Sequence, residues 1–293
     1  MKILVTGGCG YIGSLLVPFL LSRKHLVVVS DPQWFGNGFL PENENLTLSR
    51  EVPDQEFDTV IHLAGLTSDT ACRLNPEQAQ YANVDFLREL ITRTYKIRKF
   101  IFMSSVAVYG NGENLGSLKV KPTTPYGEFK KECEILLWSK AALESNVYII
   151  RSAGVVGYAP RMRFDLTLNK MCRDAFKTGV ITVCGGEQLR PHVHINDLID
   201  IFLRILDNQQ APGTFNLVRK NMTVLEAARL VKKHIPCEID ISERTDDRSY
   251  SVLPQLPAPR TISSAIEDLR ARFKDGYWRD AMKNPDYMNI PQL

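Results

Sequence analysis

Three residues of the chain have the chemistry and the spacing to move a proton between a hydroxyl group and the protein. Tyr126 and Lys130 are four positions apart, which places them on one face of a helix. Tyrosine has a pKa of about 10 and is a weak base at neutral pH, but a nearby ammonium group favours the phenolate and lowers that pKa. The hydroxyl of Ser105 could polarise a substrate oxygen. The three side chains predict a site that deprotonates an alcohol, although a Tyr–Lys pair alone also occurs on ordinary amphipathic helices.

The elements that must position these residues start with a glycine-rich turn. The apolar stretch 2–6 predicts a buried strand, and residues 12–20 carry apolar side chains at helical spacing. A strand, a glycine turn and a helix can bind the pyrophosphate of a dinucleotide, because glycine permits the tight turn and close backbone approach while the helix N-terminus attracts phosphate. The glycines fit in two frames, starting at Gly7 or at Gly8. The predicted cofactor-binding residues here are Gly7, Gly10, Tyr11, Ile12 and Gly13.

Asp31 ends the next predicted strand, residues 25–30. An acidic residue about 20 positions after such a turn can accept hydrogen bonds from the ribose hydroxyls of adenosine. Its negative charge would also repel a 2′-phosphate. The sequence therefore favours NAD over NADP; the alternative is a turn-forming Asp before Pro32.

Strands and helices alternate along the first half of the chain. Strands are predicted at 2–6, 25–30, 46–48, 58–65, 98–104 and 147–151, and helices at 76–95 and 125–143. This order predicts an α/β fold with a doubly wound parallel sheet of the Rossmann type. Ser105 follows one strand, and Ala64 and Gly65 end another, where small residues let a ligand lie against the backbone. These positions lie at the carboxyl edge of the sheet, where such folds bind ligands.

The pattern becomes irregular after Arg151. Helices are predicted at 165–178, 196–206, 224–233 and 262–273, with strands at 181–183 and 214–218. We expect a smaller, irregular C-terminal lobe over the carboxyl edge of the sheet. The predicted division assigns residues 1–154 with 186–220 to the cofactor-binding domain, and residues 155–185 with 221–293 to a substrate-binding lobe.

The overall composition disfavours several classes of protein. The 293 residues are 44% hydrophobic and 24% charged, which is ordinary for a soluble globular protein. A net charge of +3 without a basic block argues against nucleic acid, and no apolar run is long enough to span a bilayer. The first strand begins at once, leaving no room for a signal peptide. Six scattered cysteines indicate free thiols in a reducing compartment, so we expect a cytoplasmic protein without a membrane partner.

No metal site is expected. His192 and His194 alternate along a short predicted strand and would therefore point to opposite faces. Other His, Cys and Asp residues do not have the spacing of metal ligands.

In their order, the motifs of the chain resemble those of extended short-chain dehydrogenases/reductases, and among these the NAD-dependent sugar-nucleotide epimerase/dehydratase family. The motifs are TGGCGYIG at 6–13, HLAG at 62–65, SSVAVYG at 104–110, PYGEFK at 125–130 and RPHVHIND at 190–197. The resemblance implies NAD as cofactor, a nucleotide-sugar substrate, Tyr126 as the base and Lys130 as its partner at the nicotinamide ribose. It further implies cofactor contacts from Leu63, Ala64, Gly65, Tyr126 and Lys130. Substrate contacts are implied from Thr67, Ser105 and Arg190, the last at the diphosphate.

The resemblance also implies a homodimer. The helices predicted at 76–95 and 125–143 would pair with their twofold mates. The apolar set Phe129, Cys133, Leu136 and Leu137 would then be partly intermolecular.

Two departures from the family bear on the reaction. Family members commonly carry an Asn a few residues after the arginine of the strand at 147–151, whereas residues 151–154 of this chain contain no Asn, which puts one nucleotide contact in doubt. Members that act as 4,6-dehydratases carry an Asp-Glu pair after the catalytic hydroxyl residue, whereas Val106 and Ala107 follow Ser105 here. Without a carboxylate to protonate a leaving hydroxyl, dehydration is disfavoured.

The favoured function is NAD-dependent oxidoreduction at a sugar carbon of a nucleotide-sugar, with epimerisation through a transient keto-sugar. One alternative is an NAD-dependent dehydrogenase or reductase of a sugar or other small carbonyl compound, which would not need Arg190. A third hypothesis, a non-catalytic NAD-sensing protein, would not need Ser105, Tyr126 and Lys130 together. The sequence leaves open the sugar, the sugar carbon and the base of the nucleotide.

Overall fold

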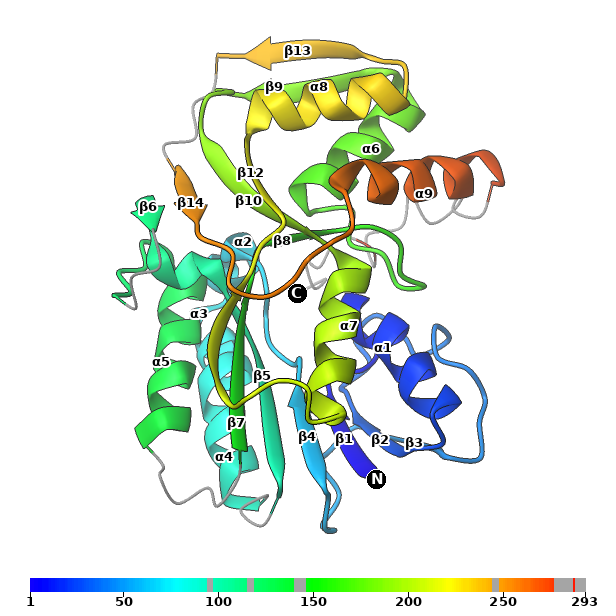
Figure 1. The fold of residues 1–293 in the computed structure, drawn as a ribbon, viewed down its shortest axis with the longest axis vertical. Coiled ribbons are helices and arrows are strands. Elements are labelled where there is room, and N and C mark those ends of the chain that lie inside the picture. The colour runs from blue at the N-terminus through cyan, green and yellow to red at the C-terminus, as the bar shows by residue number, and fades with distance from the viewer. Residues whose placement is uncertain (94–96, 115–118, 140–145, 244–247, 277–286, 288–293) are drawn as a thin grey trace.

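The computed structural model describes residues 1–93, 97–114, 119–139, 146–243, 248–276 and 287. At its centre is a sheet of seven parallel strands in the order β11-β7-β5-β4-β1-β2-β3 (Figure 1). These strands are β1 (Lys2–Thr6), β2 (Leu26–Ser30), β3 (Leu46–Ser49), β4 (Thr59–His62), β5 (Lys99–Ser105), β7 (Asn146–Ser152) and β11 (Gly213–Leu217). The chain winds outward from β1 through β2 and β3, then returns to β4 on the other side. The direction of winding therefore changes between β1 and β4, and ligands bind at such a point in open α/β sheets.

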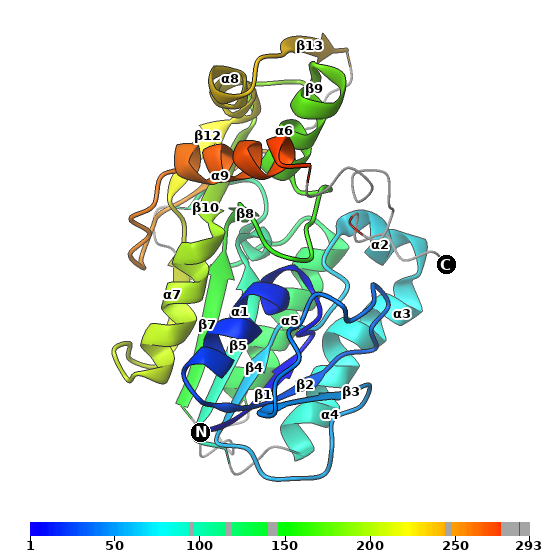
Figure 2. The ribbon, with the colours of Figure 1, turned by 90° about the vertical axis from the view of Figure 1, so that its right-hand side faces the viewer.

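Helices cover both faces of this sheet, because alternate residues of each strand point to opposite sides. Ile3 and Val5 of β1 pack in one core with α1 (Tyr11–Ser22) and α7 (Ile195–Leu206). Leu4 packs in the other core, with α4 (Phe86–Arg93) and α5 (Pro125–Ser139). Figure 2 shows the sheet between these helices. The structure thus confirms the predicted doubly wound parallel sheet.

The two long predicted helices differ in detail from the expectation. The helix predicted at 76–95 is a succession of α3 (Pro76–Gln80), a π-helical segment (Tyr81–Asp85) and α4, and residues 94–95 lie outside the described residues. The helix predicted at 125–143 begins at Pro125 as expected and is described to Ser139. Two short helices were not predicted: α2 (Asp69–Leu74) and a 3₁₀ helix (Val106–Tyr109).

A smaller lobe lies beyond the carboxyl edge of the large sheet (Figures 1 and 2). It holds a three-stranded sheet in the order β12-β10-β8, and the pair β13-β9. Its elements are β8 (Gly154–Val156), α6 (Thr167–Thr178), β9 (Val180–Cys184), β10 (Leu189–His194), β12 (Lys220–Thr223), α8 (Val224–His234), β13 (Glu238–Ser242) and α9 (Ile262–Lys274). A further pair, β6 (Gly112–Asn114) with β14 (Tyr250–Val252), joins the two parts of the chain.

The chain passes between the two parts several times. The predicted cofactor domain includes residues 186–194, whereas β10 pairs with β8 and β12 in the small sheet. By contrast, α7 and β11 lie with the large sheet, on the side to which they were assigned. The exact division of the chain therefore stays a prediction.

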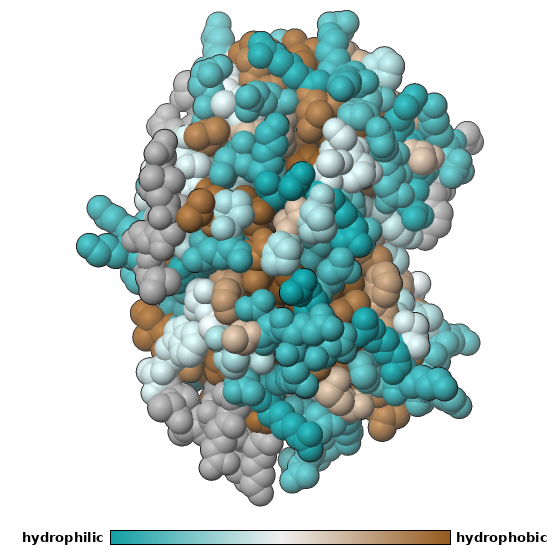
Figure 3. All heavy atoms as spheres, in the orientation of Figure 1, coloured by the Kyte–Doolittle hydropathy of each residue, from teal (hydrophilic) through white to brown (hydrophobic). Residues whose placement is uncertain are grey.

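The described surface is mixed in character. Figure 3 shows a mainly hydrophilic face with hydrophobic side chains scattered over it. None of the helices in the described ranges is long and apolar enough to cross a membrane.

Candidate active site

The glycine turn between β1 and α1 depends on contacts that leave no room for a side chain. Gly7 has φ +71°, and a Cβ there would lie 2.7 Å from the backbone nitrogen of Ala64. A Cβ on Gly13 would overlap the carbonyl oxygen of Gly8. The turn therefore packs directly against the end of β4 on one side and the first turn of α1 on the other. Gly10 is the N-cap of α1 and supplies no side-chain cap, so the helix start can offer backbone N–H groups to an anion.

The turn opens onto a cavity of about 600 Å³. This volume lies within the ~300–1,000 Å³ typical of small-molecule sites. Nine of the predicted cofactor residues line it: Gly7, Gly10, Tyr11, Ile12, Gly13, Asp31, Leu63, Ala64 and Gly65. Thr67, predicted at the substrate, lines it as well, whereas Tyr126 and Lys130 are not among its lining residues. One cavity thus contains both the glycine turn, which can bind a pyrophosphate, and the Asp31 carboxylate, which can bind a ribose. Both groups are needed to bind a dinucleotide.

Asp31 is held at the rim of the glycine turn. One carboxylate oxygen accepts a hydrogen bond from the backbone N–H of Cys9 at 2.9 Å, and the other accepts from the N–H of Gln33 at 2.7 Å. Burial raises the pKa of Asp31, while these hydrogen bonds and the nearby Arg161 act to lower it. Each oxygen keeps a second lone pair, so the carboxylate can still accept from a ribose hydroxyl.

Ser105 and Tyr126 meet where β5 ends and α5 begins. Ser105 is the last residue of β5, and its Oγ caps the 3₁₀ helix by accepting from the N–H of Ala107 at 3.2 Å. Tyr126 is the second residue of α5, and a side-chain hydrogen bond joins it to Ser105. Gly127 lets the two elements approach, because a Cβ there would lie 2.6 Å from the carbonyl oxygen of Ala107. Two of the three predicted catalytic hydroxyl and amine groups are therefore in direct contact.

Lys130 lies one turn further along α5 and is 3% exposed. Its Nζ is 4.7 Å from the ring centroid of Phe102 and 5.7 Å from that of Tyr126. Burial lowers the pKa of Lys130. The contact with the two aromatic faces favours the charged ammonium, which keeps a cation beside Tyr126.

The charges around Tyr126 differ from the expectation. Burial raises its pKa, and among the groups that lower the pKa Arg163 has the largest effect, followed further down by the hydrogen bond from Ser105. The sequence had assigned this role to Lys130. Asp69 and Cys72 act in the opposite direction and raise the pKa.

Arg163 is a site residue that the sequence reading missed. It lies between β8 and α6, lines the cavity, and donates from Nη1 to Oγ1 of Thr67 at 2.8 Å. Its guanidinium also forms an ion pair with Asp165, which raises the pKa of Arg163 against the opposing effect of burial. Arg161, also missed, is buried with its guanidinium 4.0 Å from the ring centroid of Phe35. The available signal was a pair of arginines in an otherwise apolar loop, followed two residues later by an acid.

Arg190 does not line the large cavity. Its Nη1 donates to the carbonyl oxygens of Leu189 and Arg248, and its guanidinium lies 5.4 Å from the ring centroid of Tyr250. Arg248 in turn lines a second pocket of about 430 Å³ and pairs with Asp69 at 3.1 Å. Arg190 therefore lies beside the second pocket, in the smaller lobe. The residues that line the second pocket are Asp69, Thr70, Arg73, Asn111, Thr123, Thr124 and Arg248.

Tyr126 lines neither pocket, but residues close to it line both. The chain segment that supplies Thr67 to the large cavity supplies Asp69 and Thr70 to the second pocket. Thr124, two residues before Tyr126, also lines the second pocket, while Arg163 of the large cavity acts on the Tyr126 hydroxyl from the other side. With this arrangement, a ligand in the large cavity and a second molecule in the second pocket can meet at Tyr126.

Several known proteins are similar to this chain in sequence or in fold. The chain is 29% identical over 265 residues to the uncharacterized UDP-glucose epimerase YtcB of Bacillus subtilis, covering 79% of this chain and 81% of that protein. It is 27% identical to the UDP-glucose 4-epimerase of Halalkalibacterium halodurans, covering 89% of each. A solved UDP-glucuronic acid 4-epimerase from Bacillus cereus, in complex with UDP-glucuronic acid and NAD, has a TM-score of 0.83 at 23% identity, covering 94% of this chain and all of that one.

The sequence model of one family matches residues 3–217, which include the glycine turn, the Ser105–Tyr126–Lys130 cluster and the whole of the large sheet. That family uses NAD, as the glycine turn and Asp31 predicted. The chain belongs to the NAD dependent epimerase/dehydratase family.

Proposed function

We propose that this protein is an NAD-dependent epimerase of a nucleotide-sugar, acting through a transient keto-sugar. The observation that carries the proposal is the position of Tyr126, which is hydrogen-bonded to Ser105 and close to residues that line a cavity with the predicted cofactor residues and a second pocket. NAD, when bound, supplies reversible hydride transfer. The remaining chemistry belongs to side chains of the chain itself.

Tyr126 removes the proton from the reacting sugar hydroxyl and later returns it. Ser105 donates a hydrogen bond to the same oxygen and so polarises it. Lys130, held between the rings of Tyr126 and Phe102, supplies a buried positive charge that favours the phenolate. Burial of the cluster strengthens each of these interactions, because they operate at low local dielectric.

A diphosphate requires cations at the far end of the substrate. Arg73 and Arg248 line the second pocket, and Arg190 lies beside it through its contact with Arg248. Guanidinium groups bind phosphate oxygens through paired, charge-assisted hydrogen bonds. These arginines would hold the nucleotide while the sugar reaches Tyr126.

Epimerisation fits the residues around Ser105 better than dehydration does. Val106 and Ala107 follow Ser105 directly and form the 3₁₀ helix, in which Val106 is buried. Neither side chain can protonate a leaving hydroxyl. The relatives named above as UDP-glucose epimerases support the same choice and suggest a UDP-sugar as substrate.

We also propose a cytoplasmic homodimer built on α5 and its neighbours. Three large apolar side chains are exposed here: Tyr81 (53%), Ile135 (57%) and Trp138 (50%). The set expected from the sequence is wrong in part. Cys133 and Leu137 are buried in the core of the same chain, and Phe129 and Leu136 pack against that core.

The test is product analysis with a panel of nucleotide-sugars. Purified protein with catalytic NAD is incubated with UDP-glucose, UDP-N-acetylglucosamine, UDP-xylose or UDP-glucuronic acid, and the sugar proton signals are followed by NMR. We expect one epimer pair to interconvert from both sides without net formation of NADH. Tyr126→Phe is the inactive control.

Other outcomes would contradict the proposal in distinguishable ways. Stoichiometric NADH would identify a dehydrogenase, and release of CO₂ from UDP-glucuronic acid a decarboxylase. Tight NAD binding without turnover of any nucleotide-sugar, including those of GDP, CDP and dTDP, would favour an NAD-sensing protein.

A further inference from the structure

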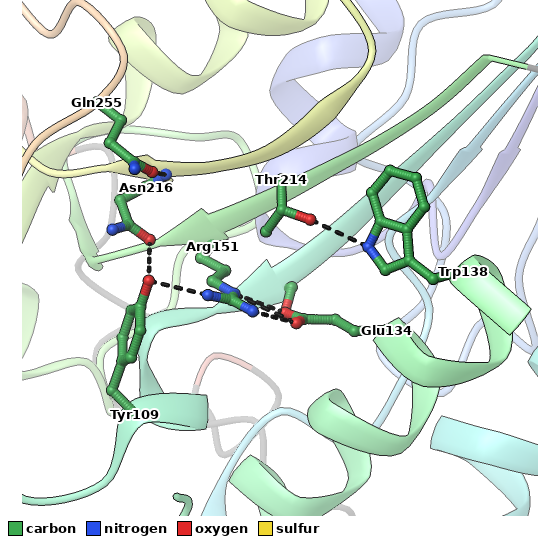
Figure 4. Close-up of polar contacts among 8 residues, drawn as sticks. Tyr109, Glu134, Trp138, Arg151, Thr214, Asn216 and Gln255 are labelled. Atoms are coloured by element: carbon green, nitrogen blue, oxygen red, sulfur yellow. Dashed lines mark hydrogen bonds and ion pairs between the residues drawn. The ribbon is translucent and has the colours of Figure 1, made fainter. Parts of the chain in front are cut away.

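A continuous chain of buried, hydrogen-bonded polar side chains includes Glu134, Arg151, Tyr109 and Asn216 (Figure 4). It begins at Ser104, the neighbour of Ser105 on β5, whose hydroxyl donates to Oε1 of Glu134 at 2.5 Å. Glu134 lies on α5, about two turns after Tyr126. Its carboxylate accepts two-pronged hydrogen bonds from Arg151 of β7, with Nη2 and Oε2 2.6 Å apart. The Glu134–Arg151 pair fastens the helix that carries Tyr126 to β7, and the hydrogen bond from Ser104 fastens the same helix to β5, the strand that carries Ser105.

Tyr109 extends the chain to the edge strand β11. Arg151 Nη1 donates to the Tyr109 hydroxyl at 2.9 Å, and that hydroxyl donates to Oδ1 of Asn216 at 2.8 Å. Figure 4 shows Tyr109 between Arg151 and Asn216. Tyr109 is also the last residue of the 3₁₀ helix that Ser105 caps. A shift of its ring would therefore act on the backbone next to the catalytic serine.

The far end of the chain is a segment that we call the strap, residues 248–256. Asn216 Nδ2 donates to the carbonyl oxygen of Leu253 at 3.3 Å, and the backbone N–H groups of Gln255 and Leu256 both donate to the Asn216 carbonyl oxygen at 3.1 Å. Side-chain Oε1 of Gln255 accepts from the Asn216 N–H at 2.8 Å. Asn216 thus binds the strap through both the side chain and the backbone of Asn216.

The strap also lies against the second pocket. It begins with Arg248, which lines that pocket, and its Ser249 hydroxyl oxygen accepts from the N–H of Leu189 at 3.0 Å, next to Arg190. The same strap carries Tyr250, whose ring faces the Arg190 guanidinium. Of the cations proposed to hold the diphosphate, Arg248 therefore belongs to the strap and Arg190 contacts it, so both are connected to the end of the buried chain.

We infer that the chain Ser104–Glu134–Arg151–Tyr109–Asn216 couples the strap to the Ser105–Tyr126 cluster, with Tyr109 as the positioning residue. The inference rests on the proposed function, in which a substrate is held at its diphosphate by one end of the chain and reacts at the other. Misplacement of a reacting group by ~1 Å can cost ~10²-fold in rate. A network that fixes the distance between the arginines at the diphosphate and the catalytic base Tyr126 would therefore raise the rate.

Stability alone does not account for the network. Glu134 and Arg151 are each 5% exposed, and a buried ion pair of this kind is often no more stabilising than apolar residues of the same volume. Such a pair does fix the orientation of both side chains, because its hydrogen bonds are directional. Tyr109 links Arg151 to Asn216 through side-chain hydrogen bonds, in addition to the backbone pairing of these two residues between β7 and β11.

The test compares Tyr109→Phe, Asn216→Ala and the double variant with a matched control. Tyr109→Phe keeps the ring and removes only the bridging hydroxyl. The control is Tyr148→Phe, since Tyr148 is a tyrosine of β7 that is 2% exposed and packs in the same hydrophobic core as Tyr109, but is not a member of the buried polar chain. We expect kcat for the nucleotide-sugar to fall roughly 10-fold in each single variant, and no more than ~2-fold further in the double variant, because either change breaks the same chain. The Kd for NADH should stay within ~2-fold, and the control should keep the parent kcat.

Two results would overturn the coupling. One is an unchanged kcat in Tyr109→Phe with only a lower Tm, which is the behaviour of a structural hydrogen bond. The other is losses of kcat that multiply in the double variant, which would mean that the two residues act separately. If either single variant fails to fold, the other single variant still gives the comparison with Tyr148→Phe.

Hydrogen exchange tests the same inference without a substrate. In Tyr109→Phe, amide exchange should become faster in both residues 103–110 and residues 250–256. In Tyr148→Phe, exchange should stay unchanged in both segments. Unchanged exchange in residues 250–256 would overturn the coupling. If the exchange is coupled while the parent protein turns over no nucleotide-sugar, the coupling stands and the proposed function fails.

Discussion

At the scale of single residues, the chemistry depends on how the charge of Tyr126 is balanced. Burial opposes the phenolate, and Asp69 adds a negative charge that opposes it further. Arg163 and the hydrogen bond from Ser105 act in favour of it. The net effect is a raised pKa, so the surroundings of Tyr126 favour the protonated hydroxyl.

Replacing Tyr126 with Phe should separate catalysis from cofactor binding. The ring keeps its packing and only the hydroxyl is lost, so turnover should fall by ~10²–10⁴-fold, the range of general acid–base catalysis. Because Tyr126 does not line the large cavity, NADH titration by fluorescence should give nearly the parent Kd. Turnover at the parent rate would show that another group removes the proton.

Arg163→Gln should shift the pH dependence of turnover. The working form of Tyr126 is the deprotonated one, so the rate rises as pH passes through its pKa. Arg163 is the cation that lowers the pKa of Tyr126 most, so its replacement should raise that pKa. The rising limb of the kcat–pH profile should then move to higher pH.

A paired variant isolates the charge effect of Arg163. Arg163→Gln alone leaves Asp165 unpaired, whereas Arg163→Gln with Asp165→Asn removes both charges of the ion pair. The profile of the double variant should therefore lie between those of the parent and of Arg163→Gln. Identical profiles in all three proteins would rule out a role of Arg163 in the titration.

Residues with a motif were easier to predict than residues held by tertiary structure. Ser105, Tyr126 and Lys130 stand in local patterns at fixed spacing, and the structure brings their segments together. Arg163 reaches Tyr126 only because the loop between β8 and α6 folds back over the cavity, and no local pattern records that path. Arg190 was expected at the diphosphate but contacts the strap, so its role stays a proposal.

At the scale of elements, the close approach of α5 to the 3₁₀ helix decides whether Ser105 and Tyr126 can touch. The contact is made at Gly127, where a side chain would meet the carbonyl oxygen of Ala107 and Cβ of Pro122. Neither neighbour is the far end of a flexible side chain. An added methyl group must therefore push the two elements apart.

Gly127→Ala should lower both stability and turnover. Overpacking of this kind costs about 1–3 kcal/mol, measurable by urea denaturation, and kcat should fall because Tyr126 moves away from Ser105. Gly38→Ala is the matched control, since nothing lies within 4 Å of a Cβ at Gly38. If Gly127→Ala matched Gly38→Ala in both measurements, the packing between these elements would not set the catalytic geometry.

Most strands and helices of the large sheet could be predicted because their burial imposes a strong apolar pattern. β1, β4 and β5 are buried on both faces and read as continuous apolar runs. The pairs β6–β14 and β13–β9 could not be predicted in full, because three to five residues form a strand there only when a distant segment supplies the partner. The π-helical segment at Tyr81–Asp85 likewise interrupts a helix whose sequence reads as continuous.

At the scale of the whole molecule, buried histidines make the fold sensitive to acid. Burial lowers the pKa of His62 to about 3 and that of His192 to about 4, from 6.5. Since the unfolded chain binds these protons first, their stabilising contribution is complete above pH 6.5 and is lost as pH falls toward the folded values.

We expect the free energy of unfolding to fall between pH 7.5 and pH 5 by roughly 2 kcal/mol for each of the two histidines. His192→Gln should remove about half of this pH-dependent loss, which separates it from the titration of carboxylates common to both proteins. Urea denaturation at the two pH values measures the difference. An equal loss in both proteins would mean that His192 is protonated in the folded chain.

The proposed dimer predicts a second property of the whole molecule. Ile135→Arg should convert the dimer to a monomer in light scattering at micromolar concentration, because a charge would enter an apolar interface. Ile241→Arg is the control, as Ile241 is equally exposed, at 58%, but lies on β13 in the other lobe. A monomeric parent protein, or a dimer that survives Ile135→Arg, would exclude this face.

The position of β11 in the chain also bears on synthesis. β7 lies between β5 and β11, but β11 leaves the ribosome only after the segments of the smaller lobe that precede it. During that interval a nascent chain carries an open edge on β7, a buried and apolar strand that could pair with a neighbouring polypeptide. Arrival of β11 closes that edge and delivers Asn216 to Tyr109 in the same event. The strand that protects the edge of β7 is therefore also the strand that completes the buried polar chain.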